Sequence, residues 1–241
     1  IEDNDTIVVL CGDTPLVKEE TLQSLFKYHL DNEYHTTVLT TRVENPTGYG
    51  RIIRDENQDL LKIVEQKDAS EEEKLVNEIN SGIYCFNGKS LREALDKIDN
   101  NNAQGEYYLT DTIEIMRSNG LKVGAFDGAT IEELMGVNSR VELAKAEEIM
   151  RKRINTMHMV NGVTIIDVNS TYIESDVQIG NDTIVYPGAM LKGNTVIGTG
   201  CTIGMNSCIT NSTIGDDTEI ESSTIVDSTV GNNTTVGPYA Y

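Results

Sequence analysis

The chain has 241 residues, which is enough for one large domain or two medium ones with cores of their own. Its 39 Asp and Glu residues against 19 Lys and Arg residues give a formal net charge of -20, which argues against nucleic acid and anionic membranes as partners because both need basic patches. No apolar run approaches the ~20 residues of a membrane span, so we predict no membrane insertion.

Cysteine and histidine spacing gives no sign of disulfides or of a metal cluster built from these residues. The four cysteines form no CxxC pair, which is typical of a reducing compartment, and we predict a cytoplasmic protein. The three histidines are too scattered for a metal site: His29, His35 and His158.

Up to about residue 138, apolar strand patterns alternate with amphipathic helix patterns. The predicted strands are Thr6–Leu10, Thr37–Arg42, Gly82–Phe86 and Lys122–Phe126. The predicted helices are Glu19–Leu30, Lys89–Lys97, Tyr108–Arg117 and Val141–Arg153. This alternation favours an α/β fold with a mostly parallel, Rossmann-like sheet covered by helices on both faces. Such sheets bind ligands at the carboxyl ends of their strands.

The first predicted strand ends in a carboxylate, in the stretch VVLCGDTPLV at 8–17. A core strand gains nothing from a charge at its tip, and a turn or a helix cap would use Asp13 only modestly. A metal or phosphate site, in contrast, needs a hard oxygen ligand at the carboxyl edge of a sheet. We therefore take Asp13 as a candidate metal ligand.

Five further stretches each have a structural and a functional interpretation. NPTGYGRI (45–52) is a hairpin turn or a close backbone approach to a ligand, and IVEQKDA (63–69) ends a strand with Glu65. EINSGIYCF (78–86) places Asn80 where an amide could hold a hydroxyl or carbonyl group. In NAQGEYYLTD (102–111), Thr110 or Asp111 could cap a helix, and so could Asn138 in MGVNSR (135–140).

From about residue 163 the pattern changes to short units that each begin with an aliphatic residue, often followed by Gly. IGNDTI (179), IGTGCT (197), IGMNSC (203) and IGDDTE (214) are examples. A six-residue period places one aliphatic side chain inward on each flat side of a triangular coil, which an ordinary β-sandwich would not show. The period shortens to five after Ile209, Ile220 and Ile225, so we expect some distorted coils there.

These repeats predict a left-handed parallel β-helix and resemble the hexapeptide-repeat acyltransferases, whose coils usually form trimers. Lys192 is the one basic residue of this half, against nine acidic ones, so no positive site for the phosphates of an acyl-CoA is visible. The helix over 141–153 is predicted to connect the two halves.

Taken together and in order, LCGDTPL, PTGYGRI, IVEQKDA, EINSGIY, NNAQGEYYLTD and GVNSR resemble the sugar nucleotidyltransferases. The similarity is to the bacterial bifunctional N-acetylglucosamine-1-phosphate uridyltransferase/glucosamine-1-phosphate acetyltransferase family and extends over essentially the whole chain. It implies an N-terminally shortened pyrophosphorylase (uridyltransferase) domain over 1–140, a linker helix over 141–161 and the start of the acetyltransferase β-helix over 162–241.

The resemblance also implies roles for the matching positions. Asp13 and Asn138 would be catalytic and would hold Mg²⁺, which takes few protein ligands and keeps several waters. The implied substrate-binding residues are Cys11, Gly12, Asp13, Gly50, Glu65, Asn80, Glu106, Tyr108, Thr110 and Asn138.

The implied reaction joins UTP and N-acetylglucosamine 1-phosphate to give UDP-N-acetylglucosamine, a cell-wall precursor, and pyrophosphate. The parent protein would also acetylate glucosamine 1-phosphate with acetyl-CoA and form a homotrimer through the β-helix. We expect a glycine-rich phosphate loop to precede Ile1 and the acetyltransferase residues to follow Tyr241, so this chain would hold an incomplete site.

Two alternatives remain open. One is a thymidylyl- or adenylyltransferase acting on glucose 1-phosphate, because base specificity would lie in front of Ile1. The other is a trimeric scaffold that does not catalyse a reaction.

Overall fold

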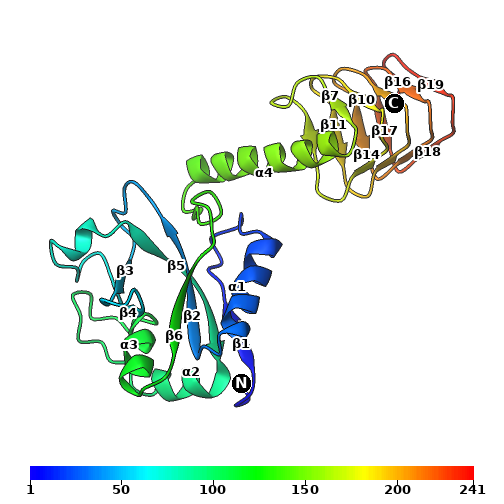
Figure 1. Ribbon diagram of the computed structural model, residues 1–241. Helices are drawn as coiled ribbons and strands as arrows, with labels where there is room; N and C mark the ends of the chain where they lie inside the picture. The colour runs from blue at the N-terminus through cyan, green and yellow to red at the C-terminus, as the bar shows by residue number, and fades with distance from the viewer. The chain divides into compact units, whose positions relative to one another are not determined.

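A computed structural model describes residues 1–241, which divide into two compact units, Ile1–Glu142 and Leu143–Tyr241. The first unit is built on one six-stranded sheet in the order β4-β3-β5-β2-β6, with β1 also paired to β5 (Figure 1). The strands are β1 (Thr6–Val9), β2 (Thr36–Arg42), β3 (Arg51–Arg54), β4 (Leu60–Val64), β5 (Glu78–Asn87) and β6 (Val123–Asp127).

This sheet is mixed, which corrects the expectation of mostly parallel strands. Only β2 and β6 pair in parallel, whereas β5 runs antiparallel to β1, β2 and β3, and β3 runs antiparallel to β4. The predicted strands include no range for β3 or β4, although IVEQKDA is interpreted as the end of a strand at Glu65, directly after β4 ends. The predicted β5 begins at Gly82, because Asn80 and Ser81 interrupt the apolar residues. Strand–helix alternation cannot reveal a hairpin inserted between the strands β2 and β5.

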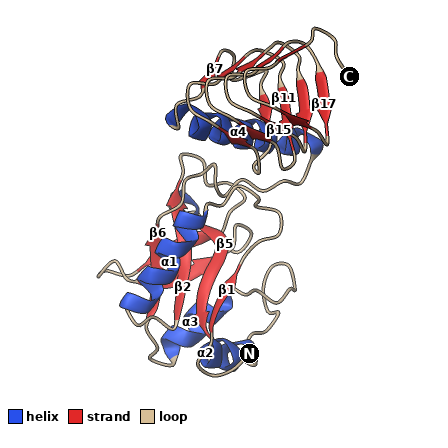
Figure 2. Cartoon of the chain, turned by 90° about the vertical axis from the view of Figure 1, so that its right-hand side faces the viewer, coloured by secondary structure: helices blue, strands red, loops and turns tan.

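Helices cover both faces of the sheet, as predicted (Figure 2). Neighbouring strand residues point to opposite faces, so Leu39 packs with Leu25 of the helix α1, while Val38 packs with Leu91 and Met116 on the other face. The helical elements are α1 (Glu19–Asp31), a 3₁₀ turn η1 (Glu73–Leu75), α2 (Gly88–Leu95) and α3 (Asp111–Ser118).

The second unit contains most of α4 (Arg140–Val160) and a parallel β-helix of three sheets. One sheet contains β7 (Thr164–Ile165), β10 (Ile184–Val185), β13 (Thr202–Ile203), β16 (Glu219–Ile220) and β19 (Thr235–Val236). The next contains β8 (Tyr172–Ile173), β11 (Met190–Lys192), β14 (Cys208–Thr210) and β17 (Thr224–Val226). The third contains β9 (Gln178–Ile179), β12 (Val196–Ile197), β15 (Thr213–Ile214) and β18 (Thr229–Val230).

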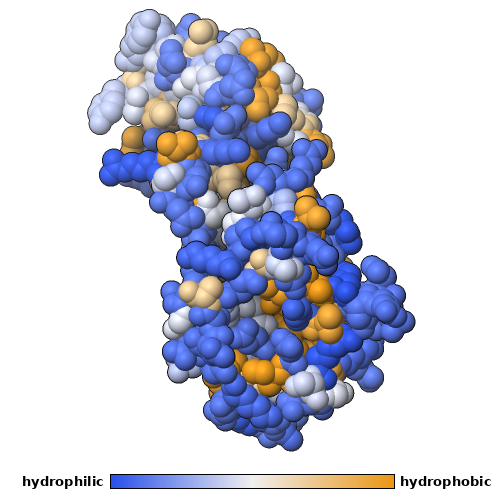
Figure 3. Space-filling view, turned by 90° about the vertical axis from the view of Figure 1, so that its left-hand side faces the viewer, coloured by the Kyte–Doolittle hydropathy of each residue, from blue (hydrophilic) through white to orange (hydrophobic).

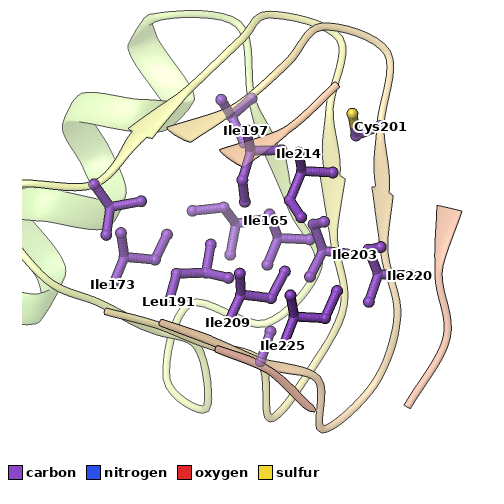
Figure 4. Packing of buried hydrophobic residues seen from close by; sticks show 14 residues of the cluster. Ile165, Ile173, Leu191, Ile197, Cys201, Ile203, Ile209, Ile214, Ile220 and Ile225 are labelled. Carbon is purple, nitrogen blue, oxygen red and sulfur yellow. The ribbon is translucent and has the colours of Figure 1, made fainter. Parts of the chain in front are cut away.

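The core of the β-helix is a stack of aliphatic side chains contributed by its strands (Figure 4). Ile203, for example, lies between Val185 and Ile220 in its sheet, and all three side chains are fully buried. The six-residue period therefore places its aliphatic residue inward, as the sequence predicts.

The shortened repeats do not distort the strands, contrary to expectation. Paired residues lie 18 positions apart at Ile184 and Thr202, and 17 apart at Thr202 and Glu219, yet both pairings are in register. The missing residues are lost at the corners of the five-residue units, where Asn211 and Ser222 adopt positive φ angles of 49° and 40°. A corner can tighten in this way because short polar side chains tolerate left-handed backbone.

The face drawn in Figure 3 is mostly hydrophilic, with separate groups of apolar side chains on both units. This agrees with the excess of 39 acidic over 19 basic residues. No helix in the structure is both long enough and apolar enough to cross a membrane.

Candidate active site

The loop after β1 is held by hydrogen bonds that aim Asp13 away from the core. Thr14 donates to the carbonyl of Cys11 from its backbone N–H at 3.4 Å and from its hydroxyl at 3.0 Å, which closes a tight turn. The carbonyl of Asp13 accepts a hydrogen bond from the N–H of Val137 at 2.8 Å. The Asp13 side chain is exposed, so burial does not force its carboxylate into the protein.

Asp13 and Asn138 come together over Gly136. A Cβ atom built on Gly136 would lie 3.3 Å from Asp13 Oδ2 and 3.3 Å from Asn138 Nδ2. The two side chains therefore border one small space that only glycine leaves open. Residues 125 positions apart in the sequence meet here because the Val137–Asp13 hydrogen bond joins their loops.

Asn138 does not cap α4, so the interpretation of this residue as a helix cap is wrong. The cap is Ser139, whose hydroxyl accepts a hydrogen bond from the N–H of Glu142 at 3.2 Å. Glu142 reaches back to the N–H of Asn138 at 2.7 Å, which completes a capping-box arrangement and lowers the pKa of its carboxyl. The side chain of Asn138 is thus left available at the space over Gly136.

A second group of predicted residues surrounds Gly50, at the start of β3. A Cβ atom on Gly50 would lie 3.3 Å from Glu65 Oε1 and 3.3 Å from Asn80 Cβ. The N–H of Asn80 donates to the carbonyl of Gly50 at 2.9 Å, and Thr110 Oγ1 donates to Glu65 Oε1 at 3.4 Å. Thr110 precedes α3 but makes no side-chain capping bond, and its hydroxyl donates to Glu65 instead.

The orientation of the Asn80 amide is set by two donors. Its Oδ1 accepts hydrogen bonds from the Tyr84 hydroxyl at 2.9 Å and from the N–H of Gly82 at 3.0 Å. Because the oxygen is occupied, the Nδ2 group is the part of the amide left to donate to a ligand. Burial raises the pKa of Tyr84 well above its usual value, so its hydroxyl keeps the proton that it donates.

Glu65 is only partly accessible, and burial raises the pKa of its carboxyl above the ordinary value. The hydrogen bond from Thr110 works in the opposite direction, while the charges of Asp68 and Asp111 add to the increase. The carboxylate therefore lies in an environment that disfavours its charge. Such a group gains from sugar hydroxyls that donate hydrogen bonds to it.

Cys11 lies between these two groups of residues. Its Sγ occupies the space that a Cβ atom on Gly82 would need, at 2.6 Å, and Gly82 itself has a φ of 77° that favours glycine. Burial, followed by the nearby charge of Asp13, raises the pKa of the Cys11 thiol, so it remains protonated. Next to it, Gly12 faces open space, with no atom within 4 Å of the place that a Cβ atom would take.

Glu106 and Tyr108 are placed differently from the other predicted residues. The backbone of Glu106 is bonded to Asn102 in its own loop, and the Tyr108 hydroxyl accepts from Gln104 at 2.8 Å and donates to Asp68 at 3.4 Å. Their hydrogen bonds thus hold the loop against the segment that follows Glu65. These hydrogen bonds do not connect Glu106 or Tyr108 to Gly50 or Asn80.

Sequence reasoning did not single out Gly82, Tyr84 or Gly136, although all three lie within stretches that it quoted. Two of them matter through the absence of a side chain, which a search for chemically reactive residues overlooks. The sequence feature that could have identified these two glycines is their spacing, because each lies two positions from a predicted site residue, Asn80 or Asn138.

A cavity of about 640 Å³ lies elsewhere, in the second unit between α4 and the strands β8 and β11. Met150, Arg151, Tyr172 and Met190 line it, and the Arg151 guanidinium lies 4.6 Å from the centre of the Tyr172 ring. None of the predicted site residues borders this cavity, so its size does not bear on the site at Asp13.

Comparison with known proteins gives two family matches. Residues 1–131 match the family model described as nucleotidyl transferase, and residues 168–241 match the one described as the GMPPB C-terminal domain. The chain is 78% identical over 241 residues to the bifunctional protein GlmU of Clostridioides difficile (strain 630), in a match that covers 100% of this chain and 52% of that protein. It is 54% identical over 240 residues to the bifunctional protein GlmU of Geobacillus sp. (strain WCH70), with coverages of 100% and 52%.

A third relative is the bifunctional protein GlmU of Clostridium kluyveri (strain ATCC 8527 / DSM 555 / NBRC 12016 / NCIMB 10680 / K1), at 56% identity over 235 residues. That match covers 98% of this chain and 51% of the relative. The chain thus spans about half the length of the curated relatives that it matches.

Proposed function

The chain belongs to the nucleotidyl transferase family, and we propose that its first unit supplies metal- and sugar-binding residues for uridylyl transfer from UTP to N-acetylglucosamine 1-phosphate. The observation that carries this proposal is the meeting of Asp13 and Asn138 over Gly136, each 3.3 Å from the same point. The high identity to bifunctional GlmU proteins supports the choice of reaction.

The donor set fits Mg²⁺. One carboxylate and one amide border the open space over Gly136, and Mg²⁺ is commonly held by one or two protein oxygens together with water and substrate phosphates. No group of three or more His, Cys, Asp or Glu side chains is arranged to hold a metal more fully. Asn138 borders the space over Gly136 with Nδ2, and a half-turn of its amide would present the oxygen that a cation needs.

In the proposed reaction, an oxygen of the sugar phosphate forms a bond to the α-phosphorus of UTP. The bond from that phosphorus to the bridging oxygen breaks, and pyrophosphate leaves. The attacking phosphate is already an anion, so no residue has to remove a proton. When bound, Mg²⁺ neutralises phosphate charge that a chain of net charge -20 would otherwise repel.

The role of the chain's own residues is therefore to bind and to orient. Asp13 and Asn138 would hold Mg²⁺, and Cys11 and Gly12 would line the adjoining path for the nucleotide, where Gly12 leaves open space. Glu65 accepts hydrogen bonds from the amino sugar.

Two further sets of residues complete this proposal. Asn80 donates from Nδ2 to the amino sugar, and Gly50 lets it approach closely, with Thr110 orienting Glu65. Glu106 and Tyr108 contribute indirectly, by holding their loop near Asp68.

For the remainder of the protein we propose the organisation implied by the sequence. Residues 1–140 form the uridyltransferase part, 141–161 the linker and 162–241 the start of an acetyltransferase β-helix. The parent protein acetylates glucosamine 1-phosphate with acetyl-CoA and forms a homotrimer through this β-helix. The parallel β-helix and the word bifunctional in the names of the relatives support this organisation. Four free cysteines are consistent with work in the cytoplasm.

Calorimetric titration of N-acetylglucosamine 1-phosphate into the chain, with and without Mg²⁺, tests the proposal. We expect binding that strengthens with Mg²⁺, and we expect Asp13→Ala to lose that dependence while its melting temperature stays near that of the wild type, because Asp13 is exposed. Equal Mg²⁺ dependence in the two proteins would contradict the metal assignment. A non-catalytic scaffold would bind no sugar phosphate at all.

Base and sugar choice is tested separately by pyrophosphate release with UTP, dTTP and ATP, each offered with N-acetylglucosamine 1-phosphate or glucose 1-phosphate. The proposal expects the UTP and N-acetylglucosamine 1-phosphate pair to be preferred. Preference for dTTP or ATP with glucose 1-phosphate would favour the thymidylyl- or adenylyltransferase alternative.

A further inference from the structure

A buried carboxylate that the proposed reaction does not use joins the two loops that carry Asp13 and Asn138. Glu133 is 1% exposed and lies in a turn between β6 and α4. Its Oε1 accepts hydrogen bonds from the N–H of Lys18 at 3.3 Å and from the hydroxyl of Thr21 at 2.5 Å. Both donors belong to the start of α1, 112 or more positions away in the sequence.

The other oxygen of Glu133 is bonded within its own turn. Oε2 accepts from the N–H of Thr130 at 3.0 Å and from the Thr130 hydroxyl at 2.8 Å, and Lys18 Nζ lies 3.7 Å away. Burial raises the pKa of this carboxyl, but the hydrogen bonds from Thr21, Thr130 and Lys18 together outweigh burial and lower it. Glu133 is therefore a buried anion with its oxygens satisfied, at the positive end of a helix.

These bonds close a short ring of chain. From Asp13 the chain runs to Lys18, crosses to Glu133 through the Lys18 hydrogen bond, and continues to Val137, whose N–H returns to the carbonyl of Asp13 at 2.8 Å. Gly136 belongs to this ring, in the stretch between Glu133 and Val137. Its Cβ position lies 3.3 Å from the side chains of Asp13 and Asn138. A ring tied at two points fixes the separation of the loops, whereas the Val137 bond alone would act as a hinge.

We propose that Glu133 is a positioning residue, which fixes the separation of Asp13 and Asn138 so that their oxygens can share one divalent cation. This rests on the proposed function, because it concerns the same metal site. Glu133 is fully enclosed by its donors and does not itself meet the metal or the sugar phosphate. Its carboxylate acts through the backbone of both loops.

The test uses Mn²⁺ as the probe, since its unpaired electrons allow free and bound ion to be distinguished by electron paramagnetic resonance. The chain is titrated with Mn²⁺ alone, as wild type, Glu133→Gln and Glu132→Gln. Glu133→Gln places an amide NH₂ next to the groups that donate hydrogen bonds to Glu133, so these bonds are lost. We expect Mn²⁺ affinity to fall about tenfold, which is typical when a residue that supports a metal ligand is mutated. Glu132 is exposed, so Glu132→Gln controls for the loss of one negative charge nearby and should leave the affinity unchanged.

A second pair of variants keeps the inference testable if Glu133→Gln does not fold. Thr21→Val removes one donor to Glu133, whereas Thr21→Ser retains the hydroxyl. We expect Val to weaken Mn²⁺ binding severalfold and Ser to restore it. Equal Mn²⁺ affinity in the Val and Ser proteins would overturn the inference, whatever their melting temperatures.

Asp13→Ala separates the two proposals. Loss of Mn²⁺ binding in Asp13→Ala together with unchanged binding in Glu133→Gln would leave the metal site standing and overturn the role of Glu133. Unchanged binding in Asp13→Ala would overturn the metal site and, with it, the inference about Glu133.

Discussion

Gly136 illustrates how an absent side chain can matter as much as a reactive one. Its Cβ position is 3.3 Å from Asp13 Oδ2 and from Asn138 Nδ2, which is closer than most Cβ contacts in proteins. The separation of the two oxygen-bearing groups therefore depends on this residue having no side chain.

We expect Gly136→Ala to weaken divalent metal binding about tenfold, because the methyl group would occupy the space between Asp13 and Asn138, the proposed ligands. Its backbone φ is not in the left-handed region, so the fold should tolerate alanine. Mn²⁺ titration measures the effect. Gly231→Ala, where the nearest atom would be 3.9 Å away, is the matched control and should bind Mn²⁺ normally.

Glu65 makes a prediction about pH, because burial raises the pKa of its carboxyl in the folded protein above the value of 4.5. As pH rises through 4.5, the unfolded chain ionises first, so the contribution of this group to folding falls until pH passes the raised pKa. Glu65→Gln does not titrate. The melting temperature of Glu65→Gln minus that of the wild type should therefore increase as pH rises across this window. The increased difference should persist at neutral pH.

Thermal unfolding of both proteins from about pH 4 to about pH 8 spans this window and measures the difference. The exposed Glu72→Gln controls for the loss of one charge on a nearby segment. A difference between Glu65→Gln and wild type that does not change with pH would show that burial does not perturb Glu65.

Among the helices, α4 shows how a capping element can free a site residue. Ser139 and Glu142 share the capping hydrogen bonds, so Asn138 keeps its side chain for Gly136 and Asp13. A sequence pattern that allowed Asn138 to be the cap could not decide this, because Ser139 and Asn138 are both good capping residues.

Ser139→Ala should therefore lower the free energy of unfolding by about 1 kcal/mol through loss of the cap. Urea unfolding checks the size of the loss. Ser118→Ala is the control, since that hydroxyl bonds the carbonyl of Ile115 at the far end of α3 and caps no N-terminus. A loss no larger for Ser139→Ala than for Ser118→Ala would contradict the capping role.

For the chain as a whole, the division into Ile1–Glu142 and Leu143–Tyr241 implies that core changes act within one unit. Ile209 is fully buried between Leu191 and Ile225 in the β-helix. Ile209→Ala should destabilise the second unit by about 2–5 kcal/mol, and Ile209→Val by only about 0.5–1.5 kcal/mol.

Hydrogen exchange resolved by peptide reports on each unit separately. Exchange should accelerate in coils around Ile209 and not in β5, and Mn²⁺ binding at Asp13 should be unaffected. Accelerated exchange in both units would show that they unfold as one.

Local pattern was sufficient for the features that repeat or that depend on neighbouring residues. The six-residue period identified the β-helix and its inward aliphatic side chains, because each coil repeats the same short-range geometry. Alternating apolar patterns likewise located α1 and the strands β1, β2 and β6 to within a residue or so. The family resemblance then brought the metal and sugar residues to attention, and their roles remain predictions.

Features that depend on contacts far apart in the sequence came from the tertiary structure. Strand direction around β5 and the β3–β4 hairpin are set by pairing across the fold, which no local period records. The meeting of Asp13 with Asn138 and the ties made by Glu133 are of the same kind. A buried carboxylate looks like any other glutamate in a sequence, because its donors, on α1 and at Thr130, become neighbours only when the chain has folded.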